Sequence, residues 1–86
     1  MTKVVIYSKD YCPYCVRAKQ LFERLKHPYE EIDLGQHPEL VTEVMEKSGG
    51  RRSVPQIFIN GKHIGGCDDL YALHDQGSLE PLLKKA

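Results

Sequence analysis

The sequence predicts a single α/β domain built around a four-stranded mixed sheet that is flanked by helices. Two observations carry this prediction. A β-branched run near the N-terminus is followed by an amphipathic helix and a second strand, a β-α-β unit whose strands must be parallel. Two later strands are separated only by Asn60-Gly61, a turn that requires antiparallel partners. A sheet with both arrangements is mixed, and its apolar strands need helices over its faces.

The first strand is expected over residues 3–7, KVVIY, which contain no turn former and are apolar enough for burial on both sides. A helix should begin at Pro13 and end at His27-Pro28, because a residue that precedes proline disfavours the helical conformation. The apolar residues of this helix recur at helical spacing, and they are Ala18, Leu21, Phe22 and Leu25.

A second strand and a second helix are expected between residues 29 and 50. Residues 29–33, YEEID, predict a strand whose charges suit an edge of the sheet. The helix should open near Pro38 and stop at Gly49-Gly50, since proline favours helix starts and glycine favours helix ends. Its apolar stripe consists of Leu40, Val41, Val44 and Met45.

The C-terminal part predicts a hairpin and two helices. The hairpin strands are residues 56–59, QIFI, and 62–65, KHIG, joined by Asn60-Gly61 in a type I′ turn. A third helix should open at Asp68 and Asp69 and end at Gly77. A short closing helix is indicated by Leu79, Leu82 and Leu83, so that the expected order is β-α-β-α-β-β-α plus a short C-terminal helix.

Composition argues against several classes of partner. Twelve Lys and Arg residues balance twelve Asp and Glu, and aromatic residues make up 8% of the chain, so nothing indicates binding to nucleic acid or to an acidic membrane. The first residues lack the apolar stretch of a secretion signal, and no apolar run approaches the roughly 18 residues that span a bilayer. We therefore expect one soluble cytoplasmic domain over residues 1–86.

Cys12 and Cys15 are the candidate reactive groups, and three functions are open to them. A disulfide staple is disfavoured because the cysteine count is odd and so short a loop constrains the unfolded chain very little. A zinc site completed by His63 and Cys67 is disfavoured because structural zinc sites draw on two compact loops, whereas His63 is expected on a strand. A redox-active dithiol beside a β-α-β unit is the remaining interpretation.

The two thiols are expected to differ in role. Cys12 precedes Pro13, which favours the first helical position, so Cys12 should be the N-cap. The N–H groups of Tyr14 and Cys15, together with the positive end of the helix, would then favour a thiolate at the N-cap. Lys9 can add a cation. Cys15 continues the apolar stripe and should face inward as a thiol, so that one sulfur attacks a disulfide and the other resolves it.

Three segments together resemble the glutaredoxin family: CPYC at 12–15, SVP at 53–55 and GGCDD at 65–69, in the right order and spacing. The likeness spans essentially residues 3–83 and is closest to the dithiol class and to small bacterial members. The chain has no Trp, and Tyr11 precedes the motif, which separates it from thioredoxin. The resemblance implies a thioredoxin-like fold and a glutathione-disulfide oxidoreductase with Cys12 and Cys15 as catalytic residues.

The resemblance also implies a glutathione site. Val54 would pair its backbone with the cysteinyl part of glutathione before a cis Pro55. The N–H groups of Cys67 and Asp68 would hold the γ-glutamyl carboxylate at the start of a helix, after two glycines that permit a close approach. The residues expected to contact glutathione are Lys9, Tyr14, Arg52, Ser53, Val54, Pro55, Gly66, Cys67, Asp68 and Asp69.

Each of these residues also has a structural interpretation. Asp68 and Asp69 are good helix-capping residues, and Lys9 and Arg52 are unremarkable as surface charges. Cys67 can be a small buried hydrophobic residue. Ser53 stands where glutaredoxins usually have threonine, and it keeps the hydroxyl group but lacks the methyl group.

The resemblance implies partners as well as a site. The substrates would be disulfide-containing or glutathionylated proteins, with ribonucleotide reductase as a family expectation, and glutathione reductase would act indirectly on oxidised glutathione. We expect a monomer without a metal. Two alternatives keep the same fold: a dimer that holds an iron–sulfur cluster through Cys12 and glutathione, and a protein reduced by thioredoxin reductase. Pro13 resembles the members without a cluster.

Overall fold

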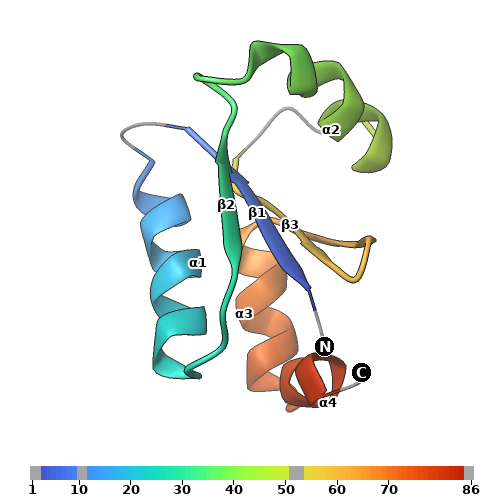
Figure 1. The fold of residues 1–86 in the computed structure, drawn as a ribbon. Helices are drawn as coiled ribbons and strands as arrows, with labels where there is room; N and C mark the ends of the chain where they lie inside the picture. The colour runs from blue at the N-terminus through green and yellow to red at the C-terminus, as the bar shows by residue number, and fades with distance from the viewer. Residues whose placement is uncertain (1–2, 10–11, 51–53, 85–86) are drawn as a thin grey trace.

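A computed structural model of the chain describes residues 3–9, 12–50 and 54–84. Figure 1 shows the arrangement of the helices and strands. The elements, in chain order, are β1 (Val4–Ser8), α1 (Pro13–Arg24), β2 (Glu30–Asp33), the 3₁₀ helix η1 (Pro38–Leu40), α2 (Val41–Lys47), β3 (Gln56–Ile59), β4 (Lys62–Gly65), α3 (Cys67–Asp75) and α4 (Leu79–Lys84). The predicted order is confirmed, with a 3₁₀ turn added before the second helix.

The sheet has the strand order β2-β1-β3-β4. β1 pairs with β2 in parallel, whereas the β1–β3 and β3–β4 pairs are antiparallel, so the mixed sheet is confirmed. β2 lies at an edge, as its charges predicted. Asn60 and Gly61 both have positive φ angles, 53° and 81°, which a type I′ turn requires.

The helices cover both faces of the sheet. α1 and α3 pack side by side on one face, and α2 lies on the other side (Figure 1). The main core lies between the sheet and the helices α1 and α3. Phe22 of α1, Ile57 of β3 and Leu70 of α3 are each 0% exposed there. Burial of these apolar side chains is the main force that holds the layers together.

One expectation about the strands is only half right. All four residues of β3 are buried, as expected for a strand covered on both faces. In β1 the burial alternates, and Val5 and Tyr7 are half-buried. Val5 and Tyr7 line a cavity of about 200 Å³ together with Lys47 of α2, and the Tyr7 ring meets Phe58 edge to face at 5.6 Å.

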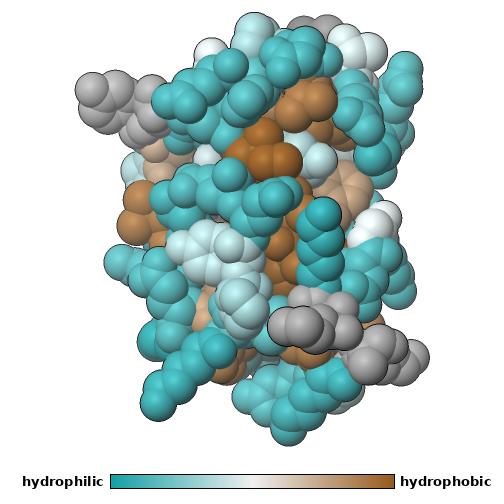
Figure 2. Space-filling model, viewed as in Figure 1, coloured by the Kyte–Doolittle hydropathy of each residue, from teal (hydrophilic) through white to brown (hydrophobic). Residues whose placement is uncertain are grey.

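The surface is mostly hydrophilic on the face shown in Figure 2, with an apolar strip between the hydrophilic groups. The longest helix in the described ranges, α1, has 12 residues. None of the helices in those ranges is both long and apolar enough to cross a membrane.

The topology places three segment ends close together. β1 ends at Ser8, next to the start of α1, and its neighbour Tyr7 is paired with Gln56 at the start of β3. β4 ends at Gly65, opposite Ile57, and leads directly into α3. The starts of α1, β3 and α3 therefore lie at the same end of the sheet, and the candidate site lies there.

Candidate active site

Cys12 is the N-cap of α1, as predicted. Its backbone is extended, with φ −106° and ψ 103°, and its Sγ accepts a hydrogen bond from the backbone N–H of Cys15 at 3.2 Å. On its other side the thiol donates to the carbonyl oxygen of Val54 at 3.7 Å. These two backbone groups hold the sulfur in place. Because Cys12 is only half-buried, a molecule in solution can still reach it.

Cys15 faces inward, also as predicted. The residue is 2% exposed. Burial is the main reason that the pKa of Cys15 is raised to about 12, and a hydrogen bond with Cys12 adds to the effect. Cys15 is therefore a thiol at neutral pH, and both sulfurs are free in the structure. The two cysteines therefore differ in exposure, since Cys12 is half-buried and Cys15 is buried.

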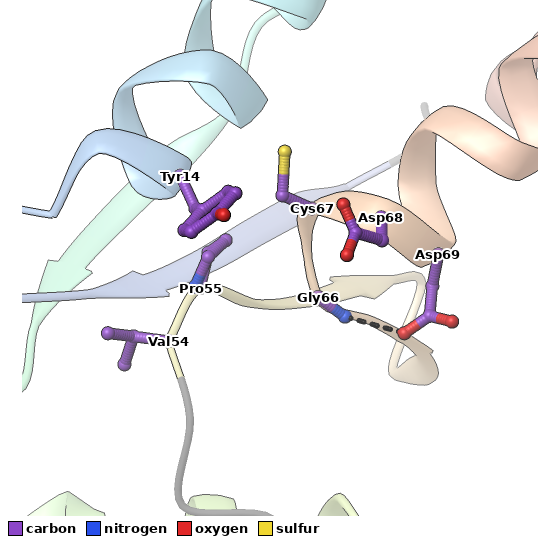
Figure 3. Close-up of a pocket in the computed structure, with 7 residues that line it drawn as sticks. All are labelled: Tyr14, Val54, Pro55, Gly66, Cys67, Asp68 and Asp69. Carbon is purple, nitrogen blue, oxygen red and sulfur yellow. Dashed lines mark hydrogen bonds between the residues drawn. The ribbon is translucent and has the colours of Figure 1, made fainter.

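A cavity of about 170 Å³ lies beside this pair. Figure 3 shows the seven residues that line it, all of which belong to the set expected to contact glutathione. Tyr14 contributes from α1 and is 52% exposed, an unusual position for a large aromatic side chain. The lining residues are Tyr14, Val54, Pro55, Gly66, Cys67, Asp68 and Asp69.

Val54 joins the cavity to the reactive sulfur. The residue lines the cavity, and its carbonyl oxygen is the group that lies 3.7 Å from Cys12 Sγ. The Val54-Pro55 peptide bond is cis, as the resemblance implied. The backbone of Val54 therefore lies next to both the cavity and Cys12 Sγ.

The start of α3 forms the opposite wall of the cavity (Figure 3). Asp69 Oδ2 accepts a hydrogen bond from the backbone N–H of Gly66 at 3.0 Å, so the capping interpretation is correct for Asp69. Asp68 is exposed and lines the cavity. Both aspartates are exposed and line the cavity, and Asp69 also caps α3.

The two glycines before α3 differ from expectation in one respect. Gly65 has a φ of 125°, and a Cβ at this position would collide with the carboxylate of Asp69. The close approach that Gly65 permits is thus to Asp69 of the same chain, whereas Gly66 lines the cavity. Cys67 is 5% exposed, as the buried-hydrophobe interpretation expects, and burial raises the pKa of its thiol.

A second cavity of about 450 Å³ lies on another side of the cysteine pair. It is lined by Lys9, Cys12, Pro13, Cys15, Val16, Lys19, Glu31 and Asp33. Lys9, one of the residues expected to contact glutathione, is therefore in this cavity and is not in the lining of the first one. Two other expected contacts, Arg52 and Ser53, lie outside the described residues.

Lys19 and Glu31 are site residues that the sequence reasoning missed. They form an ion pair with 2.9 Å between Lys19 Nζ and Glu31 Oε2, and both line the second cavity. A signal was present for Lys19, because it lies four residues after Cys15 and therefore on the same side of the helix. Nothing in the sequence indicated which of the charges on β2 would meet it.

His63, a ligand in the zinc alternative, has other neighbours. Its Nε2 lies 2.7 Å from Gln56 Oε1, and its ring is 5.1 Å from that of Phe58. These contacts belong to the β3–β4 hairpin. In the described ranges, no three His, Cys, Asp or Glu side chains gather where they could hold a metal ion.

Comparison with known proteins gives consistent results. A family model described as glutaredoxin matches residues 4–64. Glutaredoxin 3 of Escherichia coli is 49% identical over 84 residues, which are 98% of this chain and 100% of that protein.

Solved structures are similar over most of the chain. The crystal structure of a buckwheat glutaredoxin–glutathione complex has a TM-score of 0.88 at 41% identity, covering 95% of this chain and 76% of that one. The solution structure of a Brucella melitensis glutaredoxin has a TM-score of 0.85 at 52% identity, covering 98% of this chain and 90% of that one. The sheet and its covering helices thus form a thioredoxin-like fold.

Proposed function

The chain belongs to the glutaredoxin family, whose members are glutathione-dependent thiol oxidoreductases, and we propose that it reduces protein disulfides and protein–glutathione mixed disulfides through Cys12 and Cys15. The observation that carries this proposal is the asymmetry of the two thiols. Cys12 is half-buried at the N-terminus of α1, whereas Cys15 is buried one turn further along the helix.

The one-thiol route needs only Cys12. Its thiolate attacks the glutathione sulfur of a protein–glutathione mixed disulfide, and the protein sulfur leaves as a thiolate that takes up a proton. Cys12 is then joined to glutathione. The thiolate of a second glutathione attacks the first glutathione sulfur, releases oxidised glutathione and regenerates the Cys12 thiolate.

The two-thiol route uses both cysteines. Cys12 attacks a protein disulfide, one protein sulfur leaves, and a mixed disulfide forms between Cys12 and the substrate. Cys15 then attacks Cys12 Sγ, which forms the Cys12–Cys15 bond and frees the second protein thiol. Two glutathione molecules reduce this bond and leave as oxidised glutathione.

Glutathione is proposed to bind along Val54 and the start of α3, and the buckwheat protein solved with glutathione supports this choice of ligand. The backbone of Val54 would pair with the cysteinyl part. The N–H groups of Cys67 and Asp68 would bind the γ-glutamyl carboxylate, with the Asp68 carboxylate near the ammonium group. The cavity of about 170 Å³ is smaller than a typical ligand pocket of about 300 Å³ or more, so part of the tripeptide would lie in the open.

We further propose a monomeric cytoplasmic protein whose substrates are disulfide-containing or glutathionylated proteins. Ribonucleotide reductase is a candidate by family only. Glutathione reductase would complete the cycle by reducing the oxidised glutathione.

The test is a glutathione-dependent assay on the wild type, Cys12→Ser and Cys15→Ser. We expect Cys12→Ser to lose both routes, because the attacking sulfur is missing. Cys15→Ser should keep reduction of a glutathionylated peptide and lose most reduction of a protein disulfide. If Cys15→Ser abolished the first activity as completely as Cys12→Ser, the proposed division of roles would be wrong.

A further inference from the structure

The second step of the two-thiol route poses a problem of protonation. Cys15 must lose its proton before it can attack Cys12, since the thiolate is the nucleophile. Yet Cys15 is 2% exposed, and burial raises the pKa of its thiol to about 12. A thiol in this environment resolves a mixed disulfide slowly unless a neighbouring group stabilises its anion.

Lys19 is placed to be that group. Cys15 and Lys19 are four residues apart on α1, a spacing that brings their Cβ atoms within about 5–6 Å on one face of the helix. Both line the cavity of about 450 Å³. A backbone hydrogen bond to Lys9 is the main effect that lowers the pKa of the Cys15 thiol against burial, and the positive charge of Lys19 lowers it further.

Glu31 holds the Lys19 ammonium at this cavity, and Ser8 in turn holds Glu31. Glu31 Oε2 accepts hydrogen bonds from Lys19 Nζ at 2.9 Å and from Ser8 Oγ at 2.8 Å. Ser8 is 2% exposed, at the end of β1, so the network is anchored in the sheet. The hydrogen bond with Lys19 lowers the pKa of Glu31 and raises that of Lys19, so both stay charged at neutral pH.

Other charges also face Cys15 across the cavity. Lys9 lies on the loop before α1, and its backbone also lowers the pKa of the Cys15 thiol, whereas Cys12 raises it. Glu31 and Asp33 lie on β2, and Asp33 Oδ1 is engaged by the backbone N–H of Gly35 at 2.7 Å. Lys19 is the cation on the same helix face as Cys15, with its side chain only 25% exposed.

We propose that Lys19, held by Glu31, which Ser8 in turn anchors, is a positioning residue that stabilises the Cys15 thiolate in the resolving step. The inference rests on the two-thiol route proposed above. In this proposal Glu31 only holds Lys19 in place. Its Oε2 already accepts two hydrogen bonds, so Glu31 is poorly suited to remove the proton from the Cys15 thiol.

The step balances without a further reactant. The Cys15 thiol releases its proton to solvent in the cavity, and its electron pair forms the bond to Cys12 Sγ. The bond between Cys12 Sγ and the substrate sulfur breaks, and the substrate leaves as a thiolate that takes up one proton. Over the attacking and resolving steps together, the active-site pair is oxidised by two electrons and the substrate disulfide is reduced by two.

The test measures the thiolate of Cys15 directly, without a substrate. In a Cys12→Ser background, alkylation of Cys15 by iodoacetamide is followed against pH, and peptide mass spectrometry separates Cys15 from Cys67. We expect Lys19→Gln to lower the thiolate fraction at a given pH by about tenfold and Lys19→Arg to restore most of it. Lys47→Gln is the matched control, because it also removes a Lys–Glu pair with 2.9 Å between the charged atoms, on α2.

Turnover of the full chain gives the second measurement. With an intact Cys12, Lys19→Gln should make the mixed disulfide with a protein substrate accumulate on acid quenching, and Lys47→Gln should not. An unchanged alkylation profile in Lys19→Gln, or a larger shift in Lys9→Gln, would overturn the proposal. Because alkylation requires no glutathione, a wild type that fails the glutathione assay would contradict the proposed function alone.

Discussion

At the scale of single residues, a separation of three positions gives Cys12 and Cys15 different chemistry. The backbone N–H of Cys15 points at Cys12 Sγ because Cys12 lies just outside the first helical turn. Cys15 lies inside that turn and on the apolar side, where solvent no longer stabilises a charge. Pro13 fixes this difference, since it sets where the helix begins.

The burial of Cys15 predicts a pH dependence of stability at high pH. Its pKa is about 12 in the folded state and near the ordinary value of 9.0 in the unfolded state. Between these values the folded state holds the proton that the unfolded state loses, so the free energy of unfolding falls as pH rises. The slope attributable to Cys15 is up to about 1.4 kcal/mol per pH unit.

Urea unfolding of the wild type and Cys15→Ala, in reducing buffer between pH 8 and pH 11, measures this slope. We expect the decline in the free energy of unfolding to be shallower in Cys15→Ala. Tyr29 titrates in the same range, because burial and a hydrogen bond to Glu23 raise its pKa to about 12, and Tyr29→Phe isolates its share. Equal slopes in the wild type and Cys15→Ala would show that Cys15 is not buried as a thiol.

At the scale of helices and strands, the site is a meeting of two helix N-termini across one short segment of backbone. α1 presents Cys12 and Tyr14, α3 presents Cys67 and Asp68, and Val54 lies between them. Both helix starts carry partial positive charge, which at the start of α3 suits the carboxylate of glutathione in the proposed complex. The β4–α3 junction must therefore keep its shape for the site to exist.

That junction predicts the effect of Gly65→Ala. Gly65 has a φ of 125°, which disfavours any side chain, and the new Cβ would collide with the Asp69 carboxylate that caps α3. We expect a loss of about 3 kcal/mol in the free energy of unfolding, from backbone strain together with a displaced cap. The KM for glutathione should rise as well, because the N–H groups of Cys67 and Asp68 would shift.

Gly77→Ala is the matched control for Gly65→Ala. Gly77 also has a positive φ, 75°, but a Cβ there meets nothing within 4 Å. We expect Gly77→Ala to lower the free energy of unfolding by about 1 kcal/mol, from backbone strain alone, and to leave the KM for glutathione unchanged. Adding Asp69→Ala should cost less in the Gly65→Ala background than in the wild type, since the contacts with the carboxylate are then removed and only the one with the Cβ of residue 69, at 2.8 Å, remains. Additive effects of the two substitutions would rule out the contact as the cause.

At the scale of the whole molecule, the local patterns predicted the elements and their order well. Proline starts, glycine ends and the Asn60-Gly61 turn act over a few residues, so the sequence contains them directly. Placing Val54 beside Cys12 was different, because the pair is separated by 42 positions and meets only when β3 pairs with β1. The resemblance to a family supplied that information.

Other features required the assembled fold. The register that puts Glu31 opposite Ile6 also brings it to Lys19, and no pattern in the sequence distinguishes Glu31 from Glu30 as the partner. The half-buried positions of β1 line a cavity with Lys47 of α2, a neighbour that short-range periodicity does not report. Tertiary packing decides such positions.

The single core predicts that the fold and the site are lost together. Phe22 is 0% exposed, within the core between α1, α3 and the sheet, and its ring lies 6.1 Å from that of Tyr29. Phe22→Ala should cost about 3–5 kcal/mol, out of a total stability of about 4–13 kcal/mol for a domain of this size. We therefore expect a large fall in Tm and one cooperative transition in which helical signal and glutathione-dependent activity disappear at the same temperature.

Val16→Ala is the matched control, because Val16 lies on the same helix and is 46% exposed. It should shift Tm by only a few degrees. If activity disappeared well before the helical signal in Phe22→Ala, the site would be a separately unfolding unit and the single-core description would fail.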